Sequence, residues 1–188
     1  GYHGMGQGPL ACMGNLNAKS RITGLMPDVH SFPFPYSYRC PFGLGGEAGV
    51  KAACNFFERT LKDPESGITK PACVIIEPIQ GEGGVIPAPV EFLQTVRRVT
   101  KELDIPMIVD EIQCGMGRSG KLFAFEYADI IPDVVLISKA IGGSQPLAVV
   151  VYNKNLDKWT AGAHAGTFRG NQLAMKAGTI VLNRVSKK

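Results

Sequence analysis

Two short apolar runs in the sequence each end at a chemically reactive side chain. The run Pro106–Asp110 ends in an acid, and the run Val134–Lys139 ends in an amine. Unbroken apolar runs of this length are typical of strands that are buried on both faces of a parallel sheet. Ligands of open α/β sheets bind beyond the carboxyl ends of such strands. We therefore expect Asp110 and Lys139 to face one crevice.

The acid and the amine together suit carbonyl chemistry. A lysine beside a dry sheet edge is expected to lose hydration, which disfavours the ammonium form and frees a nucleophilic amine. A nearby aspartate can hold a proton on a heteroaromatic nitrogen. Pyridoxal phosphate needs both groups, because it has an aldehyde and a ring nitrogen. From these two positions alone an alternative stays open, in which Lys139 is a solvated charge and Asp110 caps a helix.

The periodicity of apolar residues predicts an α/β fold with a mostly parallel sheet and flanking helices. Residues 1–46 are rich in Gly and Pro and are expected to form an irregular loop with a weak helical stretch at 10–17. After this loop, strands and helices alternate, and such units predict right-handed crossovers. The expected strands are 72–77, 106–110, 134–138 and 147–152, and the expected helices are 46–63, 89–103, 123–127 and a final one from 171.

The composition is that of an ordinary globular protein and argues against several functions. The net charge is +4, and no basic run exceeds two residues, so we expect no nucleic-acid partner. No run of eighteen apolar residues occurs, so we expect no membrane span and a cytoplasmic location. Five scattered cysteines indicate reduced thiols. His3, His30 and His164 lack metal-ligand spacing, and we therefore expect no metal site.

Three successive predicted strands lead into polar segments that together resemble a known family. The segments are Glu77-Pro-Ile-Gln-Gly-Glu-Gly-Gly84, Asp110-Glu-Ile-Gln-Cys-Gly-Met-Gly-Arg-Ser-Gly120 and Ser138-Lys-Ala-Ile-Gly-Gly143. In this order and spacing they resemble the class III pyridoxal-phosphate aminotransferases of fold type I. The resemblance runs from Tyr2 to the C-terminal helix. It implies that residues 1–188 are the central part of the large, cofactor-binding domain.

The resemblance implies a role for each polar residue at the strand ends. Lys139 matches the lysine that binds the aldehyde of pyridoxal 5'-phosphate and later moves a proton between the substrate and the cofactor. Asp110 matches the acid that keeps the pyridine nitrogen protonated. Gln113 matches a residue that touches the phenolic oxygen of the ring.

Further positions match family residues around the cofactor and the substrate. Tyr2 matches an aromatic that stacks on the ring, and His3 lies beside it in the same cofactor-binding motif. Thr167 matches a hydroxyl that crosses a dimer interface to the cofactor phosphate. Glu82 matches a carboxylate near the substrate. Glu77 is a second candidate there, although it can instead bond the backbone at the strand end. Taken singly, each of these positions also fits an ordinary loop or turn residue.

Within the family, several segments resemble the diaminobutyrate:2-oxoglutarate aminotransferases. Examples are Tyr2-His-Gly-Met-Gly-Gln-Gly8 and Gly162-Ala-His-Ala-Gly-Thr-Phe-Arg-Gly170. The implied reaction moves the terminal amine of L-2,4-diaminobutyrate to 2-oxoglutarate, giving aspartate 4-semialdehyde and glutamate, or runs in reverse. The resemblance also implies a homodimer or a larger homo-oligomer.

Two parts of the family pattern have no match in these 188 residues. One is an upstream phosphate-binding loop, and the other is a C-terminal small domain with a substrate-binding arginine. We therefore expect residues 1–188 alone to be inactive. Two alternatives remain open, namely a non-catalytic fragment with a structural or interaction role, and another class III ω-aminotransferase.

Overall fold

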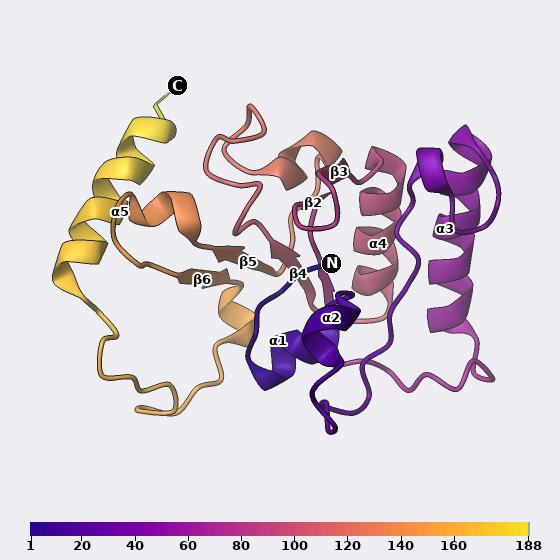
Figure 1. Cartoon of the computed structure of the whole chain (residues 1–188), viewed down its shortest axis with the longest axis horizontal. Coiled ribbons are helices and arrows are strands. Elements are labelled where there is room, and N and C mark those ends of the chain that lie inside the picture. Colours follow the sequence, from indigo (N-terminus) through magenta and orange to yellow (C-terminus); the bar gives the residue numbers. More distant parts are fainter. Residues whose placement is uncertain (188) are drawn as a thin grey trace.

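The fold centres on a four-stranded sheet in the order β1-β4-β5-β6 (Figure 1). The computed structural model describes residues 1–187. Strands β1 (Val74–Ile76), β4 (Met107–Asp110) and β5 (Val134–Ile137) run parallel, and β6 (Val149–Tyr152) pairs antiparallel with β5 at the edge. The predicted α/β class with a mostly parallel sheet is confirmed.

The helices begin and end where the local sequence requires it. α3 (Gly46–Lys62) stops before Asp63, because the residue that precedes a proline disfavours helical backbone. α4 (Val90–Glu102) starts directly after Pro89. α5 (Gln172–Val185) starts directly after its N-cap residue Asn171, whose side chain accepts two backbone N–H groups of the first turn. Three short 3-10 helices lie between the strands or after them, at Ala124–Ala128 (η2), Lys139–Gly142 (η3) and Lys154–Leu156 (η4).

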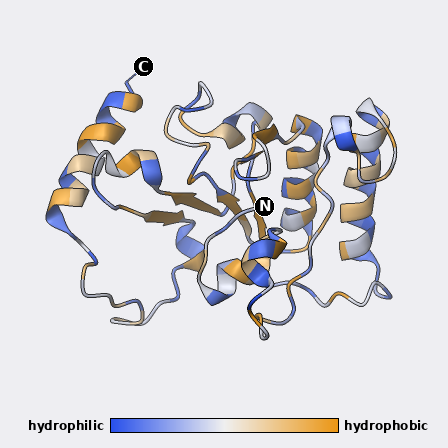
Figure 2. Cartoon of the chain, viewed as in Figure 1, coloured by the Kyte–Doolittle hydropathy of each residue, from blue (hydrophilic) through white to orange (hydrophobic). Residues whose placement is uncertain are grey.

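The main core lies between the sheet and the pair of helices α3 and α4. Phe57 of α3 and Phe92 of α4 meet edge to face, with ring centroids 6.3 Å apart. Val96 packs with them against Met107 and Val109 of β4, which are fully buried. Figure 2 shows the apolar strands and the apolar faces that the helices turn inward. A second, smaller cluster joins β5 and η3 to α5, through Ile137, Ile141 and Val181.

The N-terminal third and the β1–α4 connection differ from the sequence predictions. The weak helical stretch at 10–17 is replaced by two short helices, α1 (Gln7–Cys12) and α2 (Leu16–Lys19), which extended backbone at Met13 separates. A fourth 3-10 helix, η1 (Ser37–Arg39), interrupts the long loop. A small hairpin of β2 (Ile79–Gln80) and β3 (Ile86–Pro87) was not predicted, because two-residue strands carry no periodic signal.

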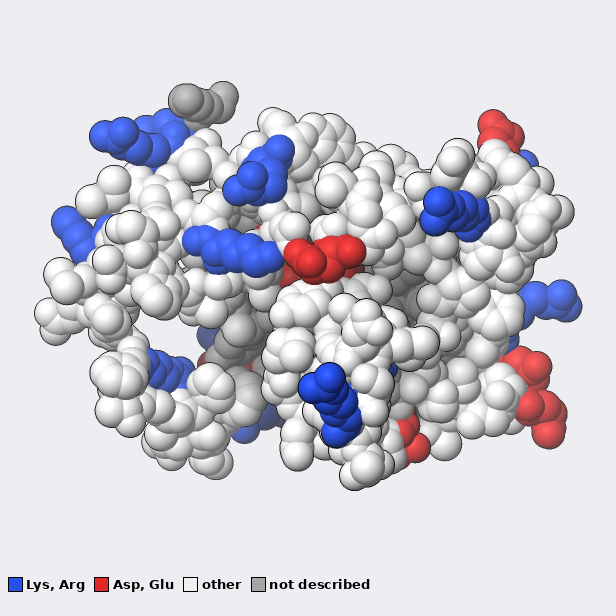
Figure 3. All heavy atoms as spheres, viewed as in Figure 1, with Lys and Arg blue, Asp and Glu red and all other residues white. Residues whose placement is uncertain are grey.

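Charged side chains are dispersed over the surface. On the face drawn in Figure 3, Lys and Arg are scattered from the middle of the face to its rim, and Asp and Glu lie near the middle and toward the right-hand edge. Within residues 1–187, no helix has both the length and the apolar character needed to cross a bilayer.

Four charged side chains link the exposed faces of α3 and α4. Glu58 accepts hydrogen bonds from Arg98 at 2.6 Å and from Lys62 at 2.7 Å, and Glu102 pairs with the same two cations. Hydrogen bonds from Arg98 and then Lys62 lower the pKa of Glu58 from 4.5 to about 2. The stabilisation from Glu58 is therefore complete above pH 4.5 and is lost as the pH falls through about 2.

Arg98→Gln should raise the pKa of Glu58 toward 4.5, because it removes the stronger of the two partners. Carboxyl titration by NMR measures this shift, and Lys101→Gln, an exposed change on the same helix, is the control. The same low pKa in wild type and Arg98→Gln would contradict the assignment.

Candidate active site

The carboxyl ends of β1, β4 and β5 meet at one edge of the sheet. Their parallel register places Ile76 beside Val109, and Asp110 beside Leu136. The residues at or just beyond these ends are Glu77, Asp110 and Lys139. Asp110 and Lys139 therefore share one sheet edge, as the apolar runs in the sequence predict.

Asp110 is a buried acid whose carboxylate accepts two hydrogen bonds. Its side chain is 4% exposed, and its Oδ2 atom lies 2.9 Å from Nδ1 of His3. An ionised carboxylate only accepts hydrogen bonds, so Nδ1 of His3 is the donor. Oδ1 of Asp110 accepts the backbone N–H of Ile112 at 3.0 Å. These bonds fix the carboxylate in one orientation and bring the N-terminal segment to the end of β4.

Lys139 and Gln113 form the second contact of the site. Nζ of Lys139 donates to Oε1 of Gln113 at 2.7 Å. The expected desolvation of Lys139 is not found, because the residue is exposed. Its side chain stands beyond the end of β5, where no covering segment lies over it within the described residues.

The backbone at Lys139 is strained. The φ angle of Lys139 is +49°, in the left-handed region that residues with a Cβ rarely adopt. A residue with such a backbone angle destabilises the folded state by about 1–3 kcal/mol. It persists only where the packing of neighbouring residues enforces it. Here Ile137 and Ile141 are buried on either side of the strained residue. The strained backbone holds the amine at the start of η3.

Glu77 ties two backbone segments to the end of β1. It is 6% exposed, and its Oε1 atom accepts the N–H of Tyr2 at 2.7 Å, while Oε2 accepts the N–H of Gly81 at 2.9 Å. Both carboxylate oxygens therefore bond backbone groups. Tyr2 is half-buried and is held at the site through its own backbone.

Two predicted site residues lie apart from this group. Glu82 is exposed in the turn between β2 and β3, and Thr167 is exposed in the loop that precedes α5. Within residues 1–187, no hydrogen bond joins either side chain to Asp110, Gln113 or Lys139. The fold thus assembles Tyr2, His3, Glu77, Asp110, Gln113 and Lys139, and it leaves Glu82 and Thr167 at the surface.

Gly81 is a site residue that the sequence reasoning missed. A Cβ atom at this position would lie 2.5 Å from Cδ of Gln113, so the amide side chain occupies the space that a larger residue needs. The only signal in the sequence is a glycine four residues after Glu77, in a turn that is rich in glycine. The absence of a side chain at Gly81 allows Gln113 to lie against this turn.

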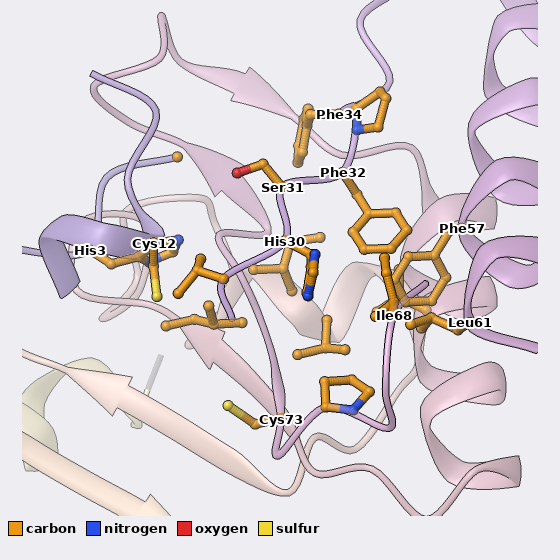
Figure 4. Close-up of a pocket in the computed structure, with 18 of the residues that line it drawn as sticks. His3, Cys12, His30, Ser31, Phe32, Phe34, Phe57, Leu61, Ile68 and Cys73 are labelled. Atoms are coloured by element: carbon orange, nitrogen blue, oxygen red, sulfur yellow. The ribbon is translucent and has the colours of Figure 1, made fainter. Parts of the chain in front are cut away.

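A cavity of about 640 Å³ lies beside the strand-end site. It follows the free edge of β1, and it takes in His3 and Glu77 but not Asp110, Gln113 or Lys139. Figure 4 shows His3 and Cys12 at one side of it, and Phe32 and Phe57 at the other. This cavity is therefore next to the reactive groups and does not contain them. Within the described residues, no group of three or more His, Cys, Asp or Glu is placed to hold a metal ion.

The parallel sheet thus brings an acid and a lysine to the edge where open α/β sheets bind ligands. The family profile described as aminotransferase class-III matches residues 1–188. The chain belongs to the class III aminotransferase family.

Individual relatives agree with this assignment. The chain is 60% identical over 187 residues to a diaminobutyrate--2-oxoglutarate aminotransferase of Rhizobium meliloti, covering 100% of this chain and 40% of that protein. It is 58% identical over 178 residues to the protein of the same name from Haemophilus influenzae, covering 95% of this chain and 39% of that protein. The chain thus spans about 40% of the length of these curated relatives.

Solved structures share the fold at lower sequence identity. An amine transaminase from an uncultivated Pseudomonas species, in a PLP-bound form, superposes with a TM-score of 0.88 at 27% identity, covering 100% of this chain and 44% of that one. An ornithine aminotransferase from Toxoplasma gondii gives a TM-score of 0.80 at 26% identity, covering 98% of this chain and 38% of that one.

Gly81→Ala should destabilise the protein by about 1–3 kcal/mol, because the new methyl group overlaps the side chain of Gln113. Denaturant unfolding measures the loss. Gly24→Ala is the matched control, since a Cβ there meets nothing within 4 Å, and its effect should stay within about 0.5 kcal/mol. Equal unfolding free energies for the two variants would show that Gly81 has no packing role.

Proposed function

We propose that this chain is the central part of the cofactor-binding domain of a pyridoxal 5'-phosphate-dependent aminotransferase. The observation that carries the proposal is the convergence of Asp110, Gln113 and Lys139 at the ends of adjacent parallel strands. Membership of the class III family supports it, and so does the PLP-bound state of a transaminase with the same fold.

The residues at the strand ends fit this cofactor. Lys139 offers an exposed primary amine for the aldehyde. Asp110 offers a buried carboxylate for the pyridine nitrogen, and Gln113 offers an amide for the phenolic oxygen. Tyr2 supplies an aromatic face, and Thr167, on the surface, is available to the cofactor phosphate of a second copy in a homodimer. When bound, the cofactor supplies a conjugated ring that accepts the electron pair left on the substrate carbon.

Two side chains of the protein act on protons in this scheme. Asp110 keeps a proton on the ring nitrogen, since a buried carboxylate close to that nitrogen favours the charged, protonated ring. His3 donates to Oδ2 of Asp110 and so keeps the carboxylate in place. Lys139 moves the proton at the substrate carbon through Nζ, and Gln113 orients that atom before reaction.

The proposed substrates are L-2,4-diaminobutyrate and 2-oxoglutarate. The support is the 60% and 58% identity to proteins named for this reaction. The terminal amine of the diamine passes to 2-oxoglutarate, which leaves aspartate 4-semialdehyde and gives glutamate. Glu82 lies in the exposed turn that Glu77 anchors through the N–H of Gly81, and it offers negative charge to the second ammonium group of the diamine. The protein is proposed to work in the cytoplasm.

A coupled assay of the full-length protein tests this function. With pyridoxal phosphate present, L-2,4-diaminobutyrate and 2-oxoglutarate should give glutamate and aspartate 4-semialdehyde in equal amounts. Ornithine and 4-aminobutyrate serve as comparison donors, and we expect much lower rates with them. Faster turnover of either comparison donor would indicate another ω-aminotransferase, and no glutamate from any donor would indicate a non-catalytic protein.

Lys139→Ala should abolish glutamate formation and leave thermal unfolding nearly unchanged. The amine is exposed and makes one hydrogen bond, so its loss removes chemistry but little packing. Lys101→Ala, at an exposed position on α4, is the control and should retain full activity. Substantial activity in Lys139→Ala would rule out the assigned nucleophile.

Asp110→Asn should lower kcat by about a hundredfold, because an amide cannot stabilise a protonated ring nitrogen as a carboxylate does. Asp104→Asn is the matched control. Asp104 is fully exposed with φ +52°, a backbone region that Asn also tolerates. Steady-state kinetics of the two variants provide the test, and equal kcat values would refute the role of Asp110.

A further inference from the structure

The carboxylate of Glu111 is buried and accepts three hydrogen bonds. Glu111 is 0% exposed, although it directly follows Asp110. Oε1 accepts the N–H of Phe125 at 2.9 Å, and Oε2 accepts the N–H of Ala124 at 3.1 Å and the thiol of Cys114 at 3.2 Å. A side chain so enclosed cannot touch substrate or cofactor. Any influence on the reaction must pass through the groups that it holds.

The partners of Glu111 anchor it to the main core. Ala124 and Phe125 are the first residues of η2, where helix N–H groups lack partners within the helix. At the other end of η2, Ala128 is buried in the main core, and its carbonyl accepts a hydrogen bond from Gln94 of α4 at 3.0 Å. The carboxylate of Glu111 therefore joins the end of β4 to a helix that the core holds.

Glu111 also shapes the turn that carries Gln113. Its N–H donates to the carbonyl of Leu136 in β5, and its carbonyl accepts the N–H of Gly115 at 3.0 Å. A Cβ on Gly115 would lie 2.7 Å from the carbonyl oxygen of Glu111, so the turn closes tightly only with glycine there. Gln113 sits inside this closed turn and reaches Lys139.

Cys114 and Glu111 match as hydrogen-bond donor and acceptor. Burial raises the pKa of Glu111, while the N–H groups of Ala124 and Phe125 favour the ionised carboxylate. Burial and the adjacent carboxylate raise the pKa of Cys114, so its thiol stays protonated and serves as the third donor. All three partners of the carboxylate are donors.

We propose that Glu111 is a positioning residue, which holds the turn 111–115 against η2 and thereby aims Gln113 at the amine of Lys139. This inference rests on the proposed function. The hydrogen bond from the N–H of Phe125 to Glu111 ties the turn to η2, and the hydrogen bond from Lys139 to Gln113 ties the turn to the amine. Together these two bonds connect the core to the reacting amine. Misplacement of a reacting group by about 1 Å can cost about a hundredfold in rate.

The test compares Glu111→Gln with Val99→Ala in the full-length protein. The amide of Gln would turn an NH₂ group toward a donor, which breaks the anchor at nearly constant volume. Val99→Ala removes two buried methyl groups from α4 in the main core and is the control for simple destabilisation. We expect Glu111→Gln to lower kcat by about tenfold with little change in KM, and Val99→Ala to leave kcat unchanged well below its melting temperature.

Hydrogen exchange of the cofactor-free protein gives a readout that does not depend on activity. Glu111→Gln should speed exchange in peptides covering 111–125 and 138–143, whereas Val99→Ala should not do so selectively. If Glu111→Gln exchanges and turns over like Val99→Ala, the positioning role is wrong. If wild type itself makes no glutamate, the proposed function fails, and exchange in 138–143 still decides whether Glu111 holds the site.

If Glu111→Gln does not fold, Ala124→Pro tests the positioning role instead. Proline removes the N–H of Ala124 and suits the first position of a helix. The preceding Phe123 has φ −128° and ψ 144°, the region that a following proline favours. We expect about a threefold loss of kcat and faster exchange in 111–125. Unchanged kcat and unchanged exchange in this variant would overturn the proposal.

Discussion

The parallel pairing of β1, β4 and β5 is the constraint on which the site depends. Parallel strands present their carboxyl ends at the same edge, so residues that are distant in the chain leave the sheet side by side. Asp110 and Lys139 are brought together in this way, with no direct bond between them. The apolar side chains of Val109 and Ile137 bury the strands and keep the register. The core therefore sets the spacing of the reactive groups.

Polar contacts between distant segments then complete the site. His3 reaches Asp110, and the backbone of Tyr2 reaches Glu77, so the N-terminal segment is held at the same sheet edge. Glu77 and Glu111 are buried acids that bond mainly backbone N–H groups. Asp110 is buried beside His3, and Lys139 is exposed beyond the end of β5. Glu77 and Glu111 thus hold backbone segments, whereas Asp110, for which we propose a role at the cofactor, also bonds the side chain of His3.

The sequence predicted the fold class, the parallel strands and the longer helices, because their apolar periodicity is strong. It also placed Asp110 and Lys139 at one edge, since strand ends follow from apolar runs. It could not predict the β2–β3 hairpin or the packing of Gln113 over Gly81, which depend on tertiary contacts. The expected desolvation of Lys139 was wrong, because the residue lies exposed beyond its strand. Position along a strand is readable from local sequence, whereas burial beyond the strand end depends on segments elsewhere in the chain.

The central claim is that Lys139 is the lysine that carries the cofactor. The most direct measurement is borohydride reduction of the full-length protein with pyridoxal phosphate, followed by peptide mapping by mass spectrometry. The account predicts a single pyridoxyl-modified peptide, with the group on Nζ of Lys139. Modification of a different lysine, or of none, would contradict it.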